Sequence, residues 1–230
     1  MKRILKYLYE QAHLVETTNI TFNYFERNPG ARLLDCGCND GAITLKIASR
    51  IGTEDVWGIE LIEDFAVKAR GKGIKVIRGD LNKGLGIGDD SVDVVHAGNV
   101  IEHLYDTDFF LKEIYRVLRG RGYLVVSTCN LASWHNIGFL VMGRQPPAAD
   151  ISDELFSNII GEEGYKLKGT GHRRIFTFDA LHRLLEYHGF EVEEKLGAGY
   201  YPLPLILARL MCRADRNHSV YMVIKARKSK

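Results

Sequence analysis

Residues 32–41 constrain the fold of this chain more than any other segment. An apolar run ends in Asp35 and leads into a short loop that contains Gly37 and Gly41, after which a helical pattern opens at Ala42. Glycine lets the backbone turn sharply and lets its N–H groups approach a ligand closely, because no Cβ stands in the way. The segment therefore predicts a strand, a tight turn and a helix, with a bound molecule at the turn.

Short apolar runs alternate with amphipathic ones from residue 31 onward, which is typical of a parallel sheet with crossover helices. This pattern predicts a doubly wound, mostly parallel seven-stranded α/β sheet with an antiparallel edge strand and helices on both faces. We expect strands at 31–36, 55–60, 74–78, 92–97, 122–128, 190–196 and 219–226. We expect helices at 41–51, 62–71, 107–119 and 177–189.

The composition narrows the class of protein. The chain has 230 residues, a net charge of +2 and 46% apolar residues, which suits one globular domain and gives no electrostatic case for a nucleic-acid partner. No apolar run reaches the ~18 uncharged residues of a membrane span, and the first residues lack the apolar core of a signal peptide. Four cysteines without zinc-binding spacing predict reduced thiols and no metal site. We therefore expect a cytoplasmic protein without stable membrane insertion.

Three carboxylates follow three of the predicted strands. Asp35 closes the first strand, Glu60 ends the second, and Asp80 comes just after the third. Ligands of open α/β sheets bind outside the carboxyl ends of the strands, so we expect these side chains near one site. Like charges would repel a pyrophosphate there, whereas a ligand with a positive centre, ribose hydroxyls and an amine would be favoured.

The order of these motifs resembles that of the class I S-adenosylmethionine-dependent methyltransferases, in particular the branch of the ubiquinone and menaquinone biosynthesis methyltransferases. The resemblance covers residues 30–130 well and residues 170–195 loosely. It implies a Rossmann-like fold and S-adenosylmethionine as the cofactor. Four stretches carry it, namely residues 33–41, Glu60, residues 79–81, and residues 91–95 together with 99–104.

The resemblance also implies roles for single residues. The backbone at Gly37 and Cys38 would approach the methionine part of the cofactor. Glu60 would hold the ribose hydroxyls, and Asp80 would accept a hydrogen bond from the adenine amine. The full set of predicted cofactor residues is Asp35, Gly37, Cys38, Asn39, Gly41, Glu60, Leu61, Asp80, Leu81 and Asn99.

The resemblance also implies roles for Leu81 and Asn99, and the chain departs from the family pattern at Asn39. By the same resemblance, the Leu81 amide would meet an adenine ring nitrogen and Asn99 would lie beside the methionine moiety. The family commonly has glycine where this chain has Asn39. Asparagine is the residue other than glycine that best tolerates a positive φ, so we expect the turn to be retained.

Two alternatives stay open for the function. Glu60 would equally suit an NAD-dependent oxidoreductase, in which an acid about 20 residues after the glycines binds a ribose. Asp80 and the absence of a G-x-G-x-x-G loop favour the methyltransferase. A non-catalytic S-adenosylmethionine-binding protein would carry the same cofactor site, because a fold and a cofactor site do not prove turnover.

The predicted reaction is the transfer of a methyl group to a small-molecule acceptor, by O- or C-methylation, in an in-line displacement. An acceptor hydroxyl or acidic carbon benefits from a base, and the candidates are Glu102, His103 and His172. Alternatively, Glu102 and His103 pin the next helix and His172 lies in a surface loop. Related quinone-pathway enzymes carry an acid that can recruit a divalent metal where this chain has Asn99, so no metal is expected.

We expect residues 1–230 to form one methyltransferase domain. Tyr24 and Phe25 could close over the cofactor or belong to the core. The apolar stretch 200–211 could meet a membrane or a lipid-like acceptor, although burial against the sheet or in a homodimer is favoured. The four predicted parts are an N-terminal helical cover (1–29), a cofactor-binding core (30–128), a lid that selects the acceptor (129–173) and the C-terminal part of the sheet (174–230).

Overall fold

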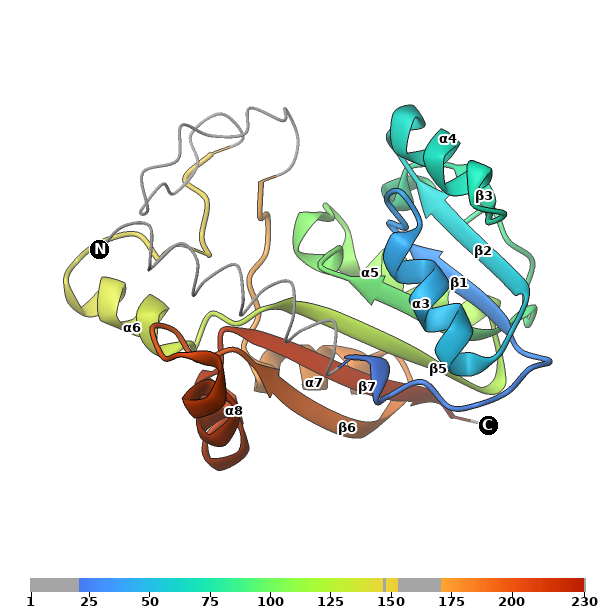
Figure 1. The fold of residues 1–230 in the computed structure, drawn as a ribbon. Coiled ribbons are helices and arrows are strands. Elements are labelled where there is room, and N and C mark those ends of the chain that lie inside the picture. Colours follow the sequence, from blue (N-terminus) through green and yellow to red (C-terminus); the bar gives the residue numbers. More distant parts are fainter. Residues whose placement is uncertain (1–20, 147, 153–170, 230) are drawn as a thin grey trace.

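The computed structural model describes residues 21–146, 148–152 and 171–229, which form one seven-stranded sheet with flanking helices (Figure 1). The strand order is β3-β2-β1-β4-β5-β7-β6. Neighbouring strands from β3 to β5 pair in parallel, whereas β7 runs antiparallel to both β5 and β6. The strands are β1 (Arg32–Cys36), β2 (Asp55–Glu60), β3 (Lys75–Arg78), β4 (Val92–Gly98), β5 (Leu118–Cys129), β6 (Phe190–Ala198) and β7 (Tyr221–Lys228).

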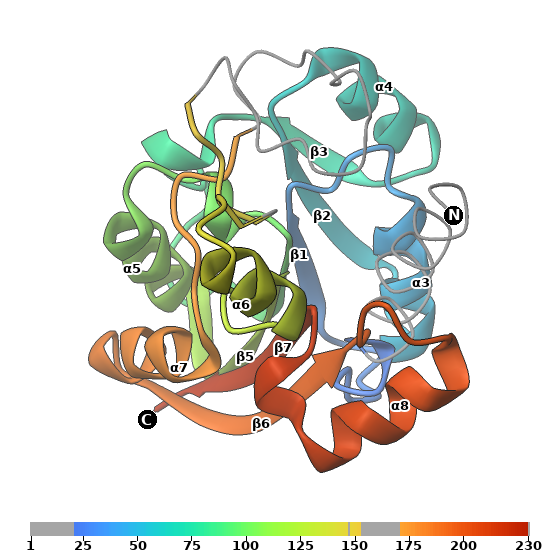
Figure 2. The ribbon, with the colours of Figure 1, turned by 90° about the vertical axis from the view of Figure 1, so that its left-hand side faces the viewer.

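Helices cover both faces of the sheet (Figure 2). Helices α3 and α4 pack on one face, and α5 and α7 pack on the other. Helix α6 follows the carboxyl end of β5, and α8 lies beside β6. The helices are α3 (Ala42–Ile51), α4 (Glu63–Gly71), α5 (Thr107–Val117), α6 (Trp134–Val141), α7 (Phe178–Tyr187) and α8 (Leu205–Ala214). The predicted Rossmann-like fold is confirmed, with its antiparallel pairing at the β6 edge.

Apolar side chains from the helices fill one core on each face. Phe110 and Ile114 of α5 and Leu181 of α7 are fully buried on one face, as their helical spacing predicts. Tyr24 and Phe25 are buried on the other face in the cluster that contains residues of α3. These two aromatic residues therefore belong to the core, which is one of the two roles considered for them, and closure over the cofactor stays a prediction.

One predicted boundary differs from the structure. The helix expected at 107–119 ends at Val117, and β5 begins at once with Leu118, which pairs with Val92 of β4. The backbone amide of Ser91 also donates to the Val117 carbonyl at 2.9 Å. Pairing with a distant strand therefore ends the helix before its local pattern does.

The predicted cover lies largely outside the described residues, and the predicted lid lies partly outside them. Of the N-terminal segment 1–29, the structure describes residues 21–29, and of the predicted lid it omits 147 and 153–170. The division into parts thus stays a prediction. Every helix in the described part of the chain falls short of the length and apolar character needed to cross a bilayer.

The start of helix α5 is capped by the side chain of Asp106. The Asp106 carboxylate accepts a hydrogen bond from the Phe109 amide at 2.8 Å and so satisfies one of the free N–H groups at the helix start. The Asp106→Ala variant should lose about 1 kcal/mol of unfolding free energy, measured by urea denaturation. Asp106→Ser, which retains a capping oxygen, should recover most of it. Equal losses in both variants would contradict this assignment.

Candidate functional site

The register of the parallel strands brings the predicted acids to one edge of the sheet. Cys36 of β1 pairs with Ile59 of β2, and Glu60 pairs with Arg78 of β3. The Gly79 amide donates to the Glu60 carbonyl at 3.1 Å, which places Asp80 just beyond the end of β2. The carboxyl ends of β1, β2 and β3 thus lie side by side, as the spacing of the acids predicts.

The loop after β1 turns through left-handed backbone conformations. Gly37, Asn39 and Gly41 have φ values of 76°, 49° and 79°. A Cβ on Gly41 would lie 2.4 Å from Cδ1 of Ile74, so glycine is required there for packing as well as for its backbone angle. Asn39 adopts the positive φ expected of an asparagine that replaces glycine.

Glu60 joins this loop to the start of α4. One carboxylate oxygen accepts from the Asn39 amide at 2.9 Å, and the other accepts from the Ile62 amide at 2.9 Å. An ionised carboxylate has about four lone-pair sites, so each oxygen retains capacity for one more donor. The two adjacent hydroxyls of a ribose match that capacity.

Asp80 caps a short turn on the next strand. Its Oδ1 accepts from the backbone amide of Asn82 at 3.0 Å and from the Asn82 side chain at 2.9 Å. These hydrogen bonds lower the pKa of Asp80, so the carboxylate is ionised at neutral pH. Both donors use Oδ1, which leaves Oδ2 for an amine. Leu81 is half-buried beside it, and Leu61 is exposed.

Asn99 carries an unsatisfied acceptor at the end of β4. The residue has a φ of 52°, and its backbone amide donates to the Ser127 carbonyl at 2.9 Å. Its Oδ1 is buried and has no hydrogen-bond partner among the described residues. A buried acceptor without a donor is costly, and the ammonium group of a methionine moiety would satisfy it. The residues at this edge therefore fit S-adenosylmethionine.

Asp35 has a different environment from the other acids. It is 2% exposed, and its two oxygens contact His96 Nδ1 at 2.7 Å and accept from the Thr44 hydroxyl. Its direct contact with the cofactor stays a prediction, because both oxygens already have partners inside the protein. His96 was not predicted, although its position in a strand next to β1 was a usable signal.

The cysteine thiols at this edge are protonated. Burial, with the nearby Asp35 carboxylate as a smaller cause, raises the pKa of Cys38 to about 12, and the same causes raise the pKa of Cys36. All four cysteines are buried and stand outside any disulfide. Cys38 also fills the space that a side chain on Gly58 would need, since a Cβ there would lie 2.5 Å from its Sγ. It is a packing residue whose backbone borders the cofactor edge.

The three candidate bases come together at the carboxyl end of β4. Glu102 and His103 lie in the short turn Ile101–His103, and the backbone amides of Arg173 and Arg174 donate to the Glu102 carbonyl at 2.7 and 3.2 Å. This holds His172 against the turn. The rings of His103 and His172 are 5.0 Å apart between centroids.

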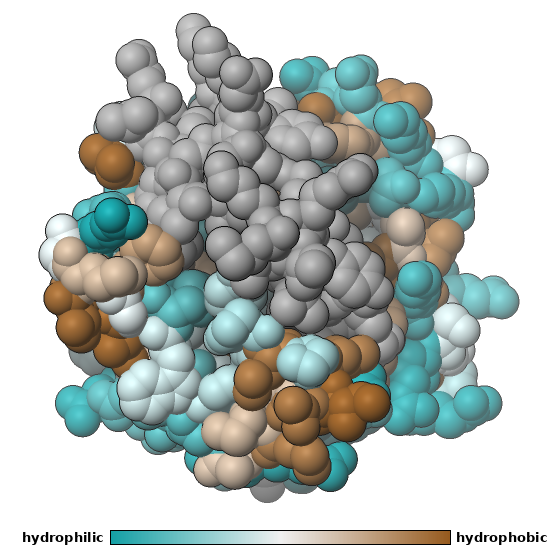
Figure 3. Space-filling model, turned by 60° about the vertical axis from the view of Figure 1, so that its left-hand side comes forward, coloured by the Kyte–Doolittle hydropathy of each residue, from teal (hydrophilic) through white to brown (hydrophobic). Residues whose placement is uncertain are grey.

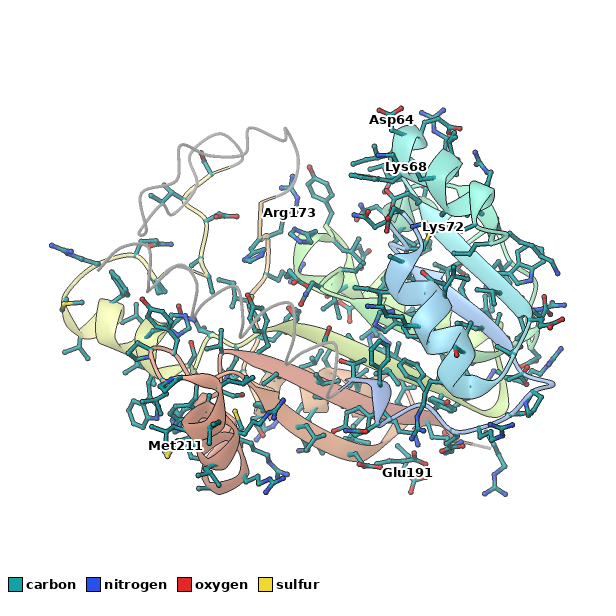
Figure 4. All side chains as sticks on the ribbon, viewed as in Figure 1. Asp64, Lys68, Lys72, Arg173, Glu191 and Met211 are labelled. Atoms are coloured by element: carbon teal, nitrogen blue, oxygen red, sulfur yellow. The ribbon has the colours of Figure 1, made fainter. Side chains whose placement is uncertain are left out.

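The same segment reaches the loop after β4 through a second contact. Arg173 extends from the segment before α7 toward that loop (Figure 4), where its guanidinium lies 3.6 Å from the centre of the Tyr105 ring. A stacked guanidinium of this kind stabilises the approach of two segments far apart in the sequence. His172 is thus placed at the β4 turn and not in a separate surface loop.

Glu102 is a buried acid with an unsatisfied oxygen. Its side chain is 2% exposed, and its Oε2 has no hydrogen-bond partner among the described residues. Burial raises the pKa of Glu102 to about 7, while the positive charge of His172 opposes the shift. The carboxyl group therefore titrates near neutral pH.

Cys129 belongs to this cluster but was not predicted. Its Sγ lies 3.8 Å from His172 Nδ1, and Glu102, Cys129 and His172 each place one donor atom within 4.8 Å of the others. These distances would allow the three side chains to share a metal ion, so the absence of metal from the reaction stays a prediction. Cys129 ends β5, the neighbour of β4, and that order of strands was the available signal.

Comparison with known proteins shows that the chain is similar to methyltransferases. Residues 34–126 match the methyltransferase domain family. A probable S-adenosylmethionine-dependent methyltransferase from Mycolicibacterium smegmatis is 32% identical over 176 residues, which is 74% of this chain and 56% of that protein. A ubiquinone biosynthesis O-methyltransferase from Sinorhizobium fredii is 28% identical over 180 residues, or 76% of this chain and 65% of that protein. The chain thus spans between about half and two thirds of the length of these relatives.

The fold has solved counterparts. The crystal structure of an S-adenosylmethionine-dependent methyltransferase from Mesorhizobium loti superposes with a TM-score of 0.65 at 20% identity, covering 91% of this chain and 96% of the other. The fold and the acidic edge define a Rossmann-like domain that binds a nucleoside cofactor. Residues 34–126 match the methyltransferase domain family, and this match together with the relatives indicates S-adenosylmethionine as the cofactor. The resemblance based on the sequence motifs is confirmed.

The burial of Glu102 predicts a pH-dependent stability. Its pKa rises from 4.5 to about 7 on folding, so the native state holds a proton that the unfolded state releases between these values. Stability should therefore fall as pH rises from about 4.5 to 7. Relative to the wild type, Glu102→Gln should gain up to about 3 kcal/mol across this window, measured by urea denaturation at several pH values.

Glu113 provides a matched control, because its pKa shifts in the opposite direction to that of Glu102. Its ion pair with Arg116 lowers its pKa, so Glu113→Gln should be less stable than the wild type at neutral pH. That deficit should shrink as pH falls from about 4.5, the ordinary pKa of the group, through the lower folded pKa. A difference between Glu102→Gln and the wild type that does not change from pH 4.5 to 7 would contradict the burial of a titrating carboxyl.

Proposed function

We propose that this chain transfers the methyl group of S-adenosylmethionine to a hydroxyl of a small-molecule acceptor by in-line displacement. When bound, S-adenosylmethionine supplies a methyl group on a positively charged sulfur. The observation that supports the proposal is the cluster of Glu102, His103 and His172 next to the edge that fits the cofactor. A base at that place removes the proton of the acceptor while the protein holds the reacting groups in line.

The hydrogen bonds of both histidines favour a tautomer that can act as a base at Nε2. His172 Nδ1 lies 2.8 Å from the Ala148 carbonyl, and His103 Nδ1 lies 3.3 Å from the Gly171 carbonyl. A carbonyl oxygen only accepts hydrogen bonds, so each Nδ1 carries the proton in the neutral ring. The lone pair is then at Nε2, where it can take the proton of an acceptor hydroxyl.

Glu102 supports this chemistry without touching the acceptor. It is too deeply buried to meet a substrate, but its carboxyl oxygen lies within 4.8 Å of the ligating atom of His172. An ionised carboxylate at that distance stabilises the imidazolium that forms when His172 takes a proton. We assign Glu102 a positioning and charge-balancing role, with His172 and His103 as the catalytic candidates.

We infer the class of acceptor from the net charge of the chain and from the name of a relative. The net charge of +2 provides little attraction for nucleic acid, so we propose a small molecule. One relative is named as an O-methyltransferase of ubiquinone biosynthesis, and a histidine base suits a hydroxyl acceptor. C-methylation of an acidic carbon is the second candidate, because the same base would remove a proton from carbon.

The cofactor edge can be tested without knowing the acceptor. Calorimetry with S-adenosylhomocysteine should show binding by the wild type, and Glu60→Ala should weaken it at least tenfold, on the order of the 1.4 kcal/mol that one charge-assisted hydrogen bond contributes. Glu63→Ala removes an equal charge from an exposed ion pair nearby and should bind normally. NAD should release no heat. Tight NAD binding without S-adenosylhomocysteine binding would favour the oxidoreductase alternative.

The bases can be tested by turnover. With methyl-labelled S-adenosylmethionine and an extract of small metabolites, the wild type should form labelled product and S-adenosylhomocysteine. His172→Asn and His103→Asn should each be tested, and loss of the base should lower the rate by about 10²–10⁴ while S-adenosylhomocysteine affinity is retained. His182→Asn, at a histidine of helix α7 that pairs with Glu186, should leave the rate unchanged.

The same assay separates the alternatives for catalysis. Binding of S-adenosylhomocysteine with no labelled product from any extract would favour a non-catalytic binding protein. Unchanged rates in both histidine variants would contradict base catalysis by this cluster.

A further inference from the structure

Two helices at the carboxyl end of the sheet present apolar side chains to solvent. Val141 at the end of α6 is 81% exposed, and Ile206 in α8 is 76% exposed. We call the exposed apolar side chains of these two segments the α6–α8 face. Its members are Trp134, Leu140, Val141, Met142, Ile206, Leu207 and Leu210.

The two helices are joined to each other through polar contacts at their flanks. Trp134 Nε1 at the start of α6 donates to the Tyr200 hydroxyl at 2.6 Å and to Asp215 at 3.1 Å. The Trp134 ring also stacks on His218, with 4.3 Å between ring centroids. Tyr200 and Asp215 lie just before and just after α8, so these contacts hold the two helices together on one side of the molecule.

The apolar side chains gather on the surface of that side. Figure 3 shows a brown patch there, at the bottom of the view. Met211, labelled in Figure 4, marks α8 in the same region. Scattered exposed apolar residues are normal, but seven large ones on two joined helices form a surface that favours a partner.

The charged residues of the two segments indicate which kind of partner the α6–α8 face binds. Neither residues 131–149 nor residues 199–214 contain an aspartate or glutamate. The arginines of these segments include Arg213 in α8 and Arg144 just after α6, both exposed. Apolar side chains with exposed arginines suit the boundary between headgroups and acyl chains of an anionic bilayer. Asp215 borders the face, where it already binds Trp134, Tyr200 and His218. Trp134, half exposed on the same face, is the type of residue that prefers this boundary.

A second copy of the chain fits the face less well. A twofold dimer through α8 would bring the same surface of both copies together, so the arginines of one copy would meet those of the other. Asp215, at the border of the face, would compensate them little, because it already accepts from Tyr200 and pairs with His218. Anionic lipid headgroups, in contrast, complement the charge while the acyl chains cover the apolar side chains.

We propose that the α6–α8 face docks this protein peripherally on an anionic lipid bilayer. The inference is independent of the proposed reaction, because it rests on the surface of α6 and α8 and not on the cluster at β4. Docking places α6, which follows the carboxyl end of β5, next to the lipid.

Vesicle flotation of the full chain tests the proposal. The protein should float with phosphatidylcholine vesicles that contain about 30% phosphatidylglycerol, and not with pure phosphatidylcholine vesicles. Binding should weaken at 1 M salt, where the Debye length falls to about 3 Å. Absence of flotation with the anionic vesicles would overturn the proposal.

A matched pair of variants locates the contact. Ile206→Ser/Leu210→Ser should reduce vesicle binding about tenfold or more, because it removes two exposed apolar side chains of the face. Val67→Ser/Tyr187→Ser removes two exposed apolar side chains elsewhere and should bind as the wild type does. Thermal unfolding should confirm that both variants are folded. Equal binding by both double variants would overturn the assignment to this face.

The oligomeric state provides the competing outcome. Light scattering should show no dimer that depends on the face. A dimer that the Ile206→Ser/Leu210→Ser variant converts to monomer, without vesicle binding by the wild type, would overturn docking in favour of an interface between copies.

Discussion

The buried carboxylate of Asp35 is the interaction on which the arrangement of the site depends. It lies at the end of β1 and contacts His96 of β4 and Thr44 of α3, so one side chain fixes three elements at the point where the cofactor loop begins. A buried carboxylate is costly unless all its oxygens have partners, and here both do. The register of β2 and β4 with β1 then places Glu60 and Asn99 beside this point.

The acids of the cofactor edge and Glu102 of the cluster at β4 differ in the hydrogen bonds that their carboxyl groups accept. At the cofactor edge, Glu60 and Asp80 accept hydrogen bonds from backbone amides, and their remaining lone pairs are available to a ligand rich in donors. Glu102 has no such donors at Oε2, and burial instead moves its pKa to about 7. Carboxyl groups at the same edge of the sheet thus differ in charge state because their environments differ.

Much of the fold and the cofactor edge was predictable because both depend on local patterns. Strand positions follow from apolar runs, and the positive φ of Asn39 follows from its place in a glycine turn. The contacts of Cys129 and His96 were not predicted, since they depend on which strands become neighbours. The placement of His172 on the Glu102 turn joins segments about 70 residues apart through backbone hydrogen bonds, and such contacts leave no periodic signal in a sequence.

The exposed face of α6 and α8 shows that an apolar stretch in a sequence does not reveal whether its side chains are buried. An apolar stretch at 200–211 is equally consistent with a core helix, and burial was the favoured interpretation. In the structure Ala208 and Cys212 turn inward on α8, while Ile206, Leu207 and Leu210 remain outside. A helix that packs through its small residues and exposes its large ones is not arranged for its own core. The cost of that exposure is offset only when another surface covers the face, and the arginines beside it favour an anionic one.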